Sequence, residues 1–402
     1  MSVKKVLFIS PTPTHPTNAG NRQHIKSLVT FFQEQNWEVH FLYFAYEDFE
    51  ISEMRSYFGS NLYIISREDL FDNHKTVKYI IQKLIGKVNG YKRNLQLYLN
   101  TITKQEFLYN SELDAGFPII AKSVIKRLQE KDNFNLVVCE YGFMSKSLTF
   151  FDQSVLKILD THDRFTGRFQ TYLNNHLKPS WVSFFRSQEQ KALKRADVIL
   201  AVHQTEADYF SKLSGKKALV FNYIPDITRL PPKNFQKRLL YIASANDINV
   251  ATISFFIKET FPLLLQKHPD TMLIIGGGVC DRLIIENKNI ILRGKVHNLV
   301  SFYSSGDIFI NPEISGTGYK VKALEALSYG MPLVATTAGA AGVTEPFTNH
   351  LFIAETSIDF VKVINQLFSN IPLLLTTSIN AHKWIRTYKK KVINDLLESI
   401  PL

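Results

Sequence analysis

The chain has 402 residues, which is long for one core and sufficient for two domains of about 150–200 residues each. Its 45% hydrophobic and 21% charged residues exclude a mostly disordered chain, and 18 glycines with 15 prolines exclude a fibrous repeat. The net charge of +11, from 47 basic and 36 acidic residues, predicts polyanionic partners: phosphates, an acidic bilayer or nucleic acid. Two distant cysteines, Cys139 and Cys280, cannot form a disulfide framework.

The first residues argue against a targeting segment. Met1–Lys5 leads directly into the short apolar run Val6–Ile9, which is too short for a secretory signal. No stretch approaches the roughly 18 apolar residues of a membrane-spanning helix. We therefore expect a soluble, cytoplasmic protein.

The first half of the chain alternates short apolar runs with helical patterns. Val6–Ile9 is followed by a Pro/Thr/Gly loop and a predicted helix at Gln23–Gln35. The runs expected to form strands are Val6–Ile9, Glu38–Phe44, Leu62–Ile65, Leu136–Glu140, Lys157–Leu159, Val198–Val202 and Ala218–Asn222. Strands separated by helical patterns indicate a parallel sheet with crossover helices on both faces.

The pattern breaks around Pro225–Arg238 and then restarts. The second set of predicted strands is Leu239–Ser244, Thr271–Ile275, Ile290–Arg293, Asp307–Asn311, Pro332–Ala335 and Leu351–Ala354, with helices at Asn249–Gln266 and Tyr319–Ser328. The fold class is therefore α/β, with two facing Rossmann-like doubly wound domains. We expect domains at 1–225 and 238–380, a linker at 226–237, and a C-terminal helix at 381–402 that returns to the first domain. Ligands of such sheets bind beyond the carboxyl ends of the strands, so the default site is an interdomain cleft.

One basic segment fits neither sheet. Residues 75–104 carry seven lysines and arginines and no acid, with apolar residues at helix-like intervals. The pattern predicts a basic amphipathic helix. It either packs its apolar side on the domain or docks on an anionic membrane. Lys383–Arg386 and Lys389–Lys391 form a second basic stretch, which is a solvated face or an extension of that surface.

The most informative segment is a glycine turn followed by a helix. Gly316, Thr317 and Gly318 follow a strand, and free amides at a helix start form an anion site. Lys320 and Lys322 lie in the first turn, where the helix dipole disfavours cations by roughly 0.3–1 kcal/mol. A charge-assisted bond to an anion contributes about 1.5–3 kcal/mol, which outweighs that cost. The two lysines therefore indicate a bound anion such as a pyrophosphate.

Lys322 and Glu325 lie three residues apart and share a helix face. The carboxylate can accept the hydroxyls of a ribose while the lysine holds the phosphates. The alternative is an ordinary exposed Glu–Lys pair, which contributes a few tenths of a kcal/mol.

These residues carry a family resemblance. The glycine turn, Lys322–Leu327 and Gly330–Thr336 resemble the donor-binding block of family 4 glycosyltransferases of the GT-B fold. The similarity extends through most of the second domain, at Ser244–Asn249, Ile275–Gly278, Gly294–His297 and Ser304–Asp307. In the first domain it is looser, at Gly20, Asp160–Asp163 and Arg195–Val202.

The resemblance implies a retaining transferase that uses a nucleotide-diphosphate sugar, UDP- or GDP-linked, and needs no metal. It assigns donor binding to Gly20, Ser244, Asn249, Gly277, Val296, Gly316, Thr317, Gly318, Lys320, Lys322 and Glu325. Two departures stand out. Thr317 replaces a glutamate found in many members, and the loop Ser244–Asn249 lacks the usual Arg and Lys. We infer that both losses shift phosphate neutralisation onto Lys320 and Lys322.

In the first domain, polar residues follow a buried strand directly at Asp160–Arg164. Such residues are costly unless they have partners or face a site. The resemblance places His162 against the donor sugar, with Asp163 and Arg164 near the acceptor. Glu140, at another strand end, is a further candidate. A capping aspartate with a satisfied histidine is the alternative, and a metal site lacks further ligands. Gly20 permits close approach of a ligand or simply connects strand and helix.

The predicted function is sugar transfer to a glycan or lipid-linked acceptor in bacterial cell-surface polysaccharide or glycoconjugate synthesis, at the inner face of the cytoplasmic membrane. The candidate catalytic residues are His162, Asp163 and Glu140, and pre-placed donors on the diphosphate would stabilise the leaving group. The alternatives are a nucleotide-sugar epimerase of the same fold and a non-catalytic nucleotide-sugar-binding module. A nucleic-acid binder is disfavoured because the chain carries no recognition motif.

Overall fold

The computed structural model describes residues 3–400, with gaps at 18, 47–50, 72–108, 115–116, 175–178, 180–181, 222, 232–233, 314–319 and 344–348. The basic segment 75–104 lies outside the described residues. Contacts divide the chain into two units: unit 1 comprises Met1–Pro16 and Leu28–Phe221, and unit 2 comprises Thr17–Ser27 and Asn222–Leu402.

Unit 1 is built on a seven-stranded, all-parallel sheet in the order β3-β2-β1-β4-β5-β6-β7. Its strands are β1 (Lys5–Ser10), β2 (Glu38–Phe44), β3 (Leu62–Ile65), β4 (Leu136–Glu140), β5 (Leu156–Asp160), β6 (Val198–Ala201) and β7 (Ala218–Val220). Its helices are α1 (Gly20–Glu34, whose first residues group with unit 2), α2 (Ser52–Phe58), η1 (Gly59–Asn61), α3 (Arg67–Phe71), α6 (Ile120–Lys131), η3 (Gly142–Phe150), α7 (Arg168–Asn174), α8 (Arg186–Lys194) and α9 (Gln204–Ser214).

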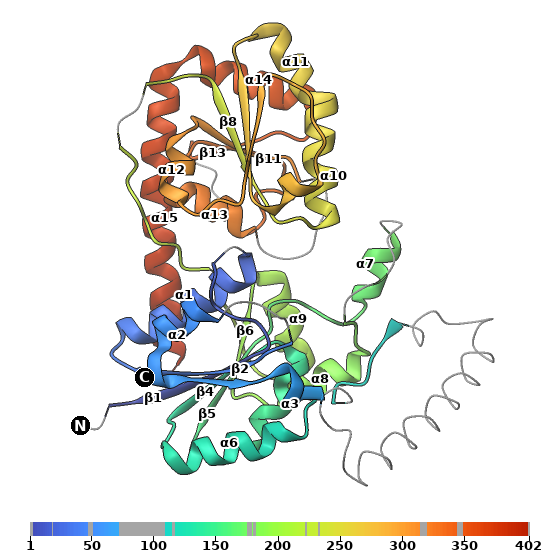
Figure 1. Cartoon of the computed structure of the whole chain (residues 1–402), viewed down its shortest axis with the longest axis vertical. Coiled ribbons are helices and arrows are strands. Elements are labelled where there is room, and N and C mark those ends of the chain that lie inside the picture. Colours follow the sequence, from blue (N-terminus) through green and yellow to red (C-terminus); the bar gives the residue numbers. More distant parts are fainter. Residues whose placement is uncertain are drawn as a thin grey trace, which may run out of the picture. The chain divides into compact units, whose positions relative to one another are not determined.

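Side chains of β1 alternate between the two faces of this sheet, as the strand period of two requires. Leu7 and Ile9 belong to a buried cluster with Ile125 of α6. Phe8 instead contacts Phe32 of α1, with ring centroids 5.8 Å apart. Figure 1 shows helices on both faces of the sheet. Because helices cover both faces of the sheet, the loops lie at the carboxyl ends of the strands.

Unit 2 is built on a six-stranded, all-parallel sheet in the order β10-β9-β8-β11-β12-β13. Its strands are β8 (Arg238–Ile242), β9 (Met272–Gly276), β10 (Ile290–Gly294), β11 (Ile308–Asn311), β12 (Leu333–Ala335) and β13 (Leu351–Ile353). Its helices are α10 (Asp247–Phe255), η4 (Phe256–Thr260), α11 (Phe261–Lys267), η5 (Gly278–Arg282), α12 (Leu299–Ser304), α13 (Val321–Ser328), α14 (Ser357–Ser369) and α15 (Ile371–Ser399).

The core of unit 2 also has two sides. Leu239, Ile275 and Ile310 cluster with apolar residues of α10, α11 and α14. Phe309, which alternates with them, contacts Tyr303 of α12 at 5.9 Å between ring centroids. Helices again cover both faces (Figure 1). Two doubly wound α/β units are thus confirmed, and every strand that the sequence predicts is present.

One helix differs from expectation. α10, η4 and α11 form a continuous helix of 21 residues, Asp247–Lys267, and an 18-residue window within it has a mean hydropathy of 1.4, so the helix suffices for a membrane span by length and composition. α14 and α15 pass the same test only together, and they are bent by 104°. The apolar side chains of Ile253, Phe256, Phe261 and Leu264 are fully buried in unit 2, which is the behaviour of a core helix.

Candidate functional site

The polar residues that the sequence singled out lie at the carboxyl ends of the strands in each unit. In unit 2, β11 ends at Asn311, and Glu313 follows with 5% of its surface exposed. Lys320 donates to Oε1 of Glu313 over 2.6 Å, and Nζ of Lys322 lies 3.3 Å from Oε2. One carboxylate therefore faces two ammonium groups, which leaves one positive charge uncompensated within this trio.

Lys322 is held by further contacts. Its Nζ donates to Oδ1 of Asn249 over 2.8 Å and lies 5.3 Å from the ring centroid of Tyr241. Asn249 is itself fixed by Nδ2, which donates to the carbonyl of Ser244 over 3.1 Å. Burial lowers the pKa of Lys322, while the nearby carboxylate of Glu313 opposes that shift. The structure thus brings together three predicted donor-binding residues.

Glu325, on α13, is 4% exposed. Tyr303 Oη donates to its Oε1 over 2.7 Å, and Gln23 Nε2 donates to its Oε2 over 2.8 Å. Burial raises the pKa of Glu325, and the two hydrogen bonds counteract this rise. The alternative of an exposed Lys322–Glu325 pair is therefore wrong, because Glu325 is buried and Lys322 contacts Asn249 and Glu313.

The predicted glycines differ in how far the structure describes them. Gly277 has φ of 89°, and a Cβ there would lie 2.2 Å from the carbonyl oxygen of Ala243, so only glycine fits between these strand ends. Val296 packs close by, with Cγ2 2.7 Å from where a Cβ on Gly276 would be. Gly20 begins α1, where a Cβ would lie 3.3 Å from Val321. Gly316, Thr317 and Gly318 lie outside the described residues.

Sequence reasoning missed four residues of this site, Glu313, Tyr303, Gln23 and Tyr241. Glu313 gave a usable signal, because it is a charged residue two positions after the end of a buried strand. Tyr303 gave no such signal, since a tyrosine on an amphipathic helix is usually predicted to be a core residue. The helix α13 also begins at Val321 rather than at Tyr319.

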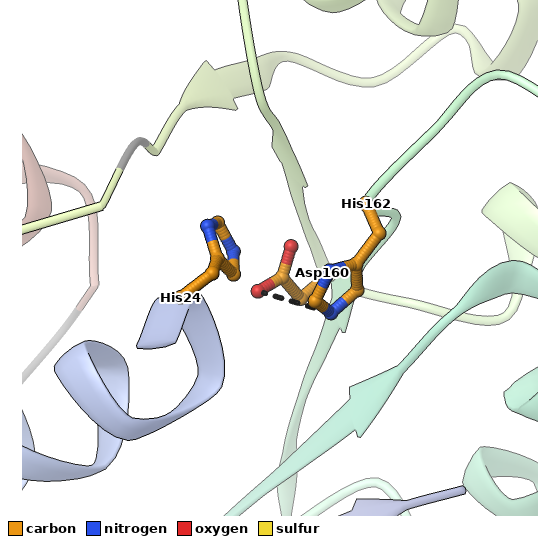
Figure 2. A group of neighbouring side chains, drawn as sticks. All are labelled: His24, Asp160 and His162. Carbon is orange, nitrogen blue, oxygen red and sulfur yellow. Dashed lines mark ion pairs between the residues drawn. The ribbon is translucent and has the colours of Figure 1, made fainter. Parts of the chain in front are cut away.

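In unit 1, Glu140 and Asp160 end the paired strands β4 and β5 in direct register. Both are fully buried. Nε2 of His162 lies 2.7 Å from Oε2 of Glu140. It also lies 4.0 Å from Oδ2 of Asp160, the ion pair marked by a dashed line in Figure 2. Burial, followed by the charge of Asp160, raises the pKa of Glu140 well above its ordinary value. The imidazole therefore lies against a carboxyl pair that favours keeping a proton.

The backbone fixes this imidazole. His162 has φ of 60° and Tyr141 has φ of 69°, conformations that cost about 1–2 kcal/mol in a non-glycine residue. Their rings stack with centroids 4.0 Å apart. Strain of this kind at two adjacent strand ends is typical of a functional site. The structure brings together His162 and Glu140, two of the three candidate catalytic residues.

Asp163 and Arg164 make other contacts. Asp163 forms an ion pair of 2.8 Å with Arg168. The Arg164 guanidinium lies 4.1 Å from the ring centroid of Tyr209. Neither residue joins the pairing of His162 with Glu140.

The comparisons with known proteins bear on the fold first. The structure resembles S. aureus TarM, in a variant solved with fondaparinux, alpha-GlcNAc-glycerol and UDP (12% identity, TM-score 0.64, covering 98% of this chain and 99% of that one). It also resembles pneumococcal GtfA, an O-GlcNAc transferase solved with UDP and GlcNAc (11% identity, TM-score 0.66, covering 99% of each chain). Anabaena HepE, solved with UDP and glucose, is similar as well (13% identity, TM-score 0.63, covering 99% of this chain and 100% of that one). The chain has the two-domain GT-B fold.

Sequence comparison bears on unit 2. Residues 236–370 match the family model described as "Glycosyl transferases group 1". A curated relative, a 44.6 kDa protein in the cps region of Klebsiella pneumoniae, is 26% identical over 163 residues, which are 37% of this chain. The match spans 42% of that relative's length. The family match covers every described donor-binding candidate except Gly20.

Proposed function

We propose that this GT-B protein is a glycosyltransferase that moves a sugar from a UDP-linked donor to a glycan or lipid-linked acceptor in bacterial cell-surface polysaccharide synthesis. The family match over residues 236–370 supports glycosyl transfer. The UDP in TarM, GtfA and HepE supports the donor base, and the cps-region relative supports the pathway class.

The observation that carries the proposal is the charge trio in unit 2. Lys320 and Glu313 are 6% and 5% exposed, and the side chain of Lys322 is 16% exposed. Burying a charge without a partner is expensive, and Glu313 can offset only one of the two lysines. A diphosphate supplies the missing negative charge. Glu325, at the next turn of α13, then meets the ribose.

The positive charge of Lys320 and Lys322 also supports metal-independent transfer. Cations placed in advance stabilise the leaving diphosphate as its charge develops. We infer a retaining reaction in which that phosphate accepts the proton of the acceptor hydroxyl, with His162 against the donor sugar. Acceptor binding falls to unit 1. The site of action is the cytoplasmic face of the membrane, where lipid-linked acceptors are available.

The first test is donor binding by the charge trio. Isothermal titration of UDP should show that Lys320→Met and Lys322→Met each weaken binding by about 10–100-fold, because each removes a charge-assisted bond worth about 1.5–3 kcal/mol. The exposed Lys383→Met is the matched control and should bind as the wild type does. EDTA should leave UDP binding unchanged.

Turnover separates transfer from its alternatives. With a panel of UDP-sugars, free UDP should appear faster when the glycan acceptor is added. An epimerase would change the sugar without an acceptor, and a binding module would release no nucleotide. Wild-type affinity of Lys322→Met for UDP would contradict the proposal.

A further inference from the structure

The segment Thr161–Thr166 follows β5 and carries His162 and Asp163. It is anchored at its start to β6, because the N–H and the hydroxyl of Thr161 both donate to the carbonyl of Leu200, over 3.1 and 2.8 Å. Beyond His162 the chain leaves the sheet. Its next backbone N–H groups need partners elsewhere.

Three successive N–H groups find those partners on two glutamates. The Arg164 N–H donates to Oε1 of Glu206 over 3.0 Å. The Phe165 N–H donates to Oε1 of Glu189 over 2.7 Å, and the Thr166 N–H donates to its Oε2 over 3.3 Å. The segment is therefore bound to α8 through Glu189 and to α9 through Glu206.

Both glutamates are 4% exposed. Burying a carboxyl group against neutral backbone donors is costly, and an apolar side chain would suit the interior better. Oε2 of Glu206 also has no hydrogen-bond partner in the described part of the chain. These residues are poor choices for packing, so the cost points to the one task they share, which is to fix residues 164–166.

We propose that Glu189 and Glu206 are positioning residues that hold the segment so that His162 stays against Glu140. The inference rests on the proposed function for the role of His162 in transfer. The hydrogen bonds between these glutamates and residues 164–166 lie within unit 1 and do not depend on a bound donor.

The charges around Glu206 set its pH response. The groups that act on it come from the packed segment, from α7 and α8, and from the cap of its own helix: Asp163, Arg164, Arg168, Glu189 and His203. Burial first, and then the charge of Asp163, raises the pKa of Glu206 to about 8. It is therefore a neutral acid at pH 7. At higher pH it ionises beside Asp163 and Glu189, and their repulsion loosens the segment.

The two glutamates allow a matched pair of substitutions. Glu206→Gln keeps the Oε1 acceptor for Arg164 and places an amide where Oε2 has no partner, so it should preserve the hold. Glu189→Gln presents an NH2 group to the Thr166 N–H, so it should break one of two bonds. Glu206→Ala and Glu189→Ala remove the acceptors entirely.

Backbone hydrogen exchange of residues 164–166 is the first measurement. At pH 7, Glu189→Gln and both alanine variants should exchange about tenfold faster there, while Glu206→Gln matches the wild type. Peptides from β1 and β4 should be unchanged in all variants, which shows that unit 1 is folded.

Kinetics with a UDP-sugar give the second measurement. Glu189→Ala should lower kcat by about 100-fold and leave the donor KM within about twofold, because the variant loses the orientation of His162 and no contact with the donor. The wild type should lose kcat above about pH 8, and Glu206→Gln should not.

The proposal is overturned if Glu206→Ala exchanges like the wild type at residues 164–166, or if Glu206→Gln exchanges as fast as Glu206→Ala. It is overturned equally if KM and kcat change together. Absence of UDP release by the wild type would instead overturn the proposed function, since the exchange measurement needs no donor.

Discussion

Five glutamates in the described part of the chain are buried, and the pKa values of three of them, Glu140, Glu206 and Glu325, are raised. Burial raises the pKa of each, because the charged form loses its hydration. Their surroundings differ. Glu140 lies beside a second carboxylate, Glu206 beside the backbone N–H of Arg164, and Glu325 beside a tyrosine and a glutamine. In each case the neutral carboxyl group is favoured more than it would be at the protein surface.

Glu206 makes stability depend on pH. Its carboxyl group has an ordinary pKa of 4.5 in the unfolded chain and about 8 in the folded protein. Between these values the unfolded chain releases the proton while the folded protein keeps it, so the free energy of unfolding falls as pH rises. The loss amounts to about 4 kcal/mol between pH 5 and pH 9.

Glu206→Gln should remove that loss. Denaturant unfolding at pH 5, 7 and 9 should show that the free energy of unfolding falls less with rising pH in this variant than in the wild type. The exposed Glu130→Gln is the control, and its free energy of unfolding should fall in parallel with that of the wild type. A parallel decline in Glu206→Gln would mean that Glu206 is already ionised in the folded protein at pH 7.

Single residues of the candidate site were predictable where they broke a local rule. Lys322 was found because a lysine in the first turn of a helix is unfavourable. Glu313 was not found, because its role depends on a lysine seven residues away along the chain meeting the end of β11. Nor could the sequence show that Gln23 and Tyr303 contact the carboxylate of Glu325.

At the scale of elements, the strand ends of unit 2 depend on a close approach. Gly277 lies where β9 passes the loop after β8, and its N–H donates to the carbonyl of Gly294 over 2.7 Å. A Cβ would clash with the backbone of Ala243. The adjacent Ser244, which holds Asn249, would move with that backbone.

Gly277→Ala should therefore destabilise unit 2 and weaken UDP binding. Gly215→Ala is the matched control, because Gly215 also has a positive φ, of 75°, but no atom within 4 Å of a built Cβ. We expect about 1–2 kcal/mol from the backbone conformation in both variants, and more in Gly277→Ala from the clash. Thermal unfolding measures the difference. Equal shifts in melting temperature would show that Ala243 moves aside freely.

Elements were predicted well, because buried parallel strands are short apolar runs between helical patterns. β2, β3 and β4 have the predicted bounds. The helix predicted at Asn249–Gln266 contains a π-helical turn, Phe256–Thr260, which apolar spacing does not reveal. Ends of helices and strands depend on caps, and the capping asparagine of α10, Asn246, lies three residues before the predicted start.

At the scale of the whole molecule, the net charge of +11 and the basic segment 75–104 make membrane association testable. The protein should float with anionic vesicles at low salt and remain in the supernatant with neutral phosphatidylcholine vesicles or in about 0.5 M salt, where charges are screened. A variant with the lysines and arginines of 75–104 changed to glutamine is the control. Flotation of that variant like the wild type would place the contact elsewhere.

The division into two α/β units was predictable from alternation alone, since two runs of strands and helices separated by prolines define them. The C-terminal helix, predicted at 381–402 and to return to the first domain, is part of α15 (Ile371–Ser399) and groups with unit 2. The grouping of residues 17–27 with unit 2 was not predictable, because it depends on tertiary contacts of α1. The role of Glu189 and Glu206 also depends on tertiary contacts, because their partners lie on a segment about 20 to 40 residues earlier, and the sequence alone did not predict it.

The strand order of unit 1 also bears on how the chain folds as it is synthesised. β1 lies between β2 and β4, with Val6 beside Leu136, so its second edge stays unpaired until the ribosome has made that later strand. During this interval an apolar edge of the nascent polypeptide is exposed. An interior position for the first strand therefore lengthens the time during which the nascent chain is prone to aggregation.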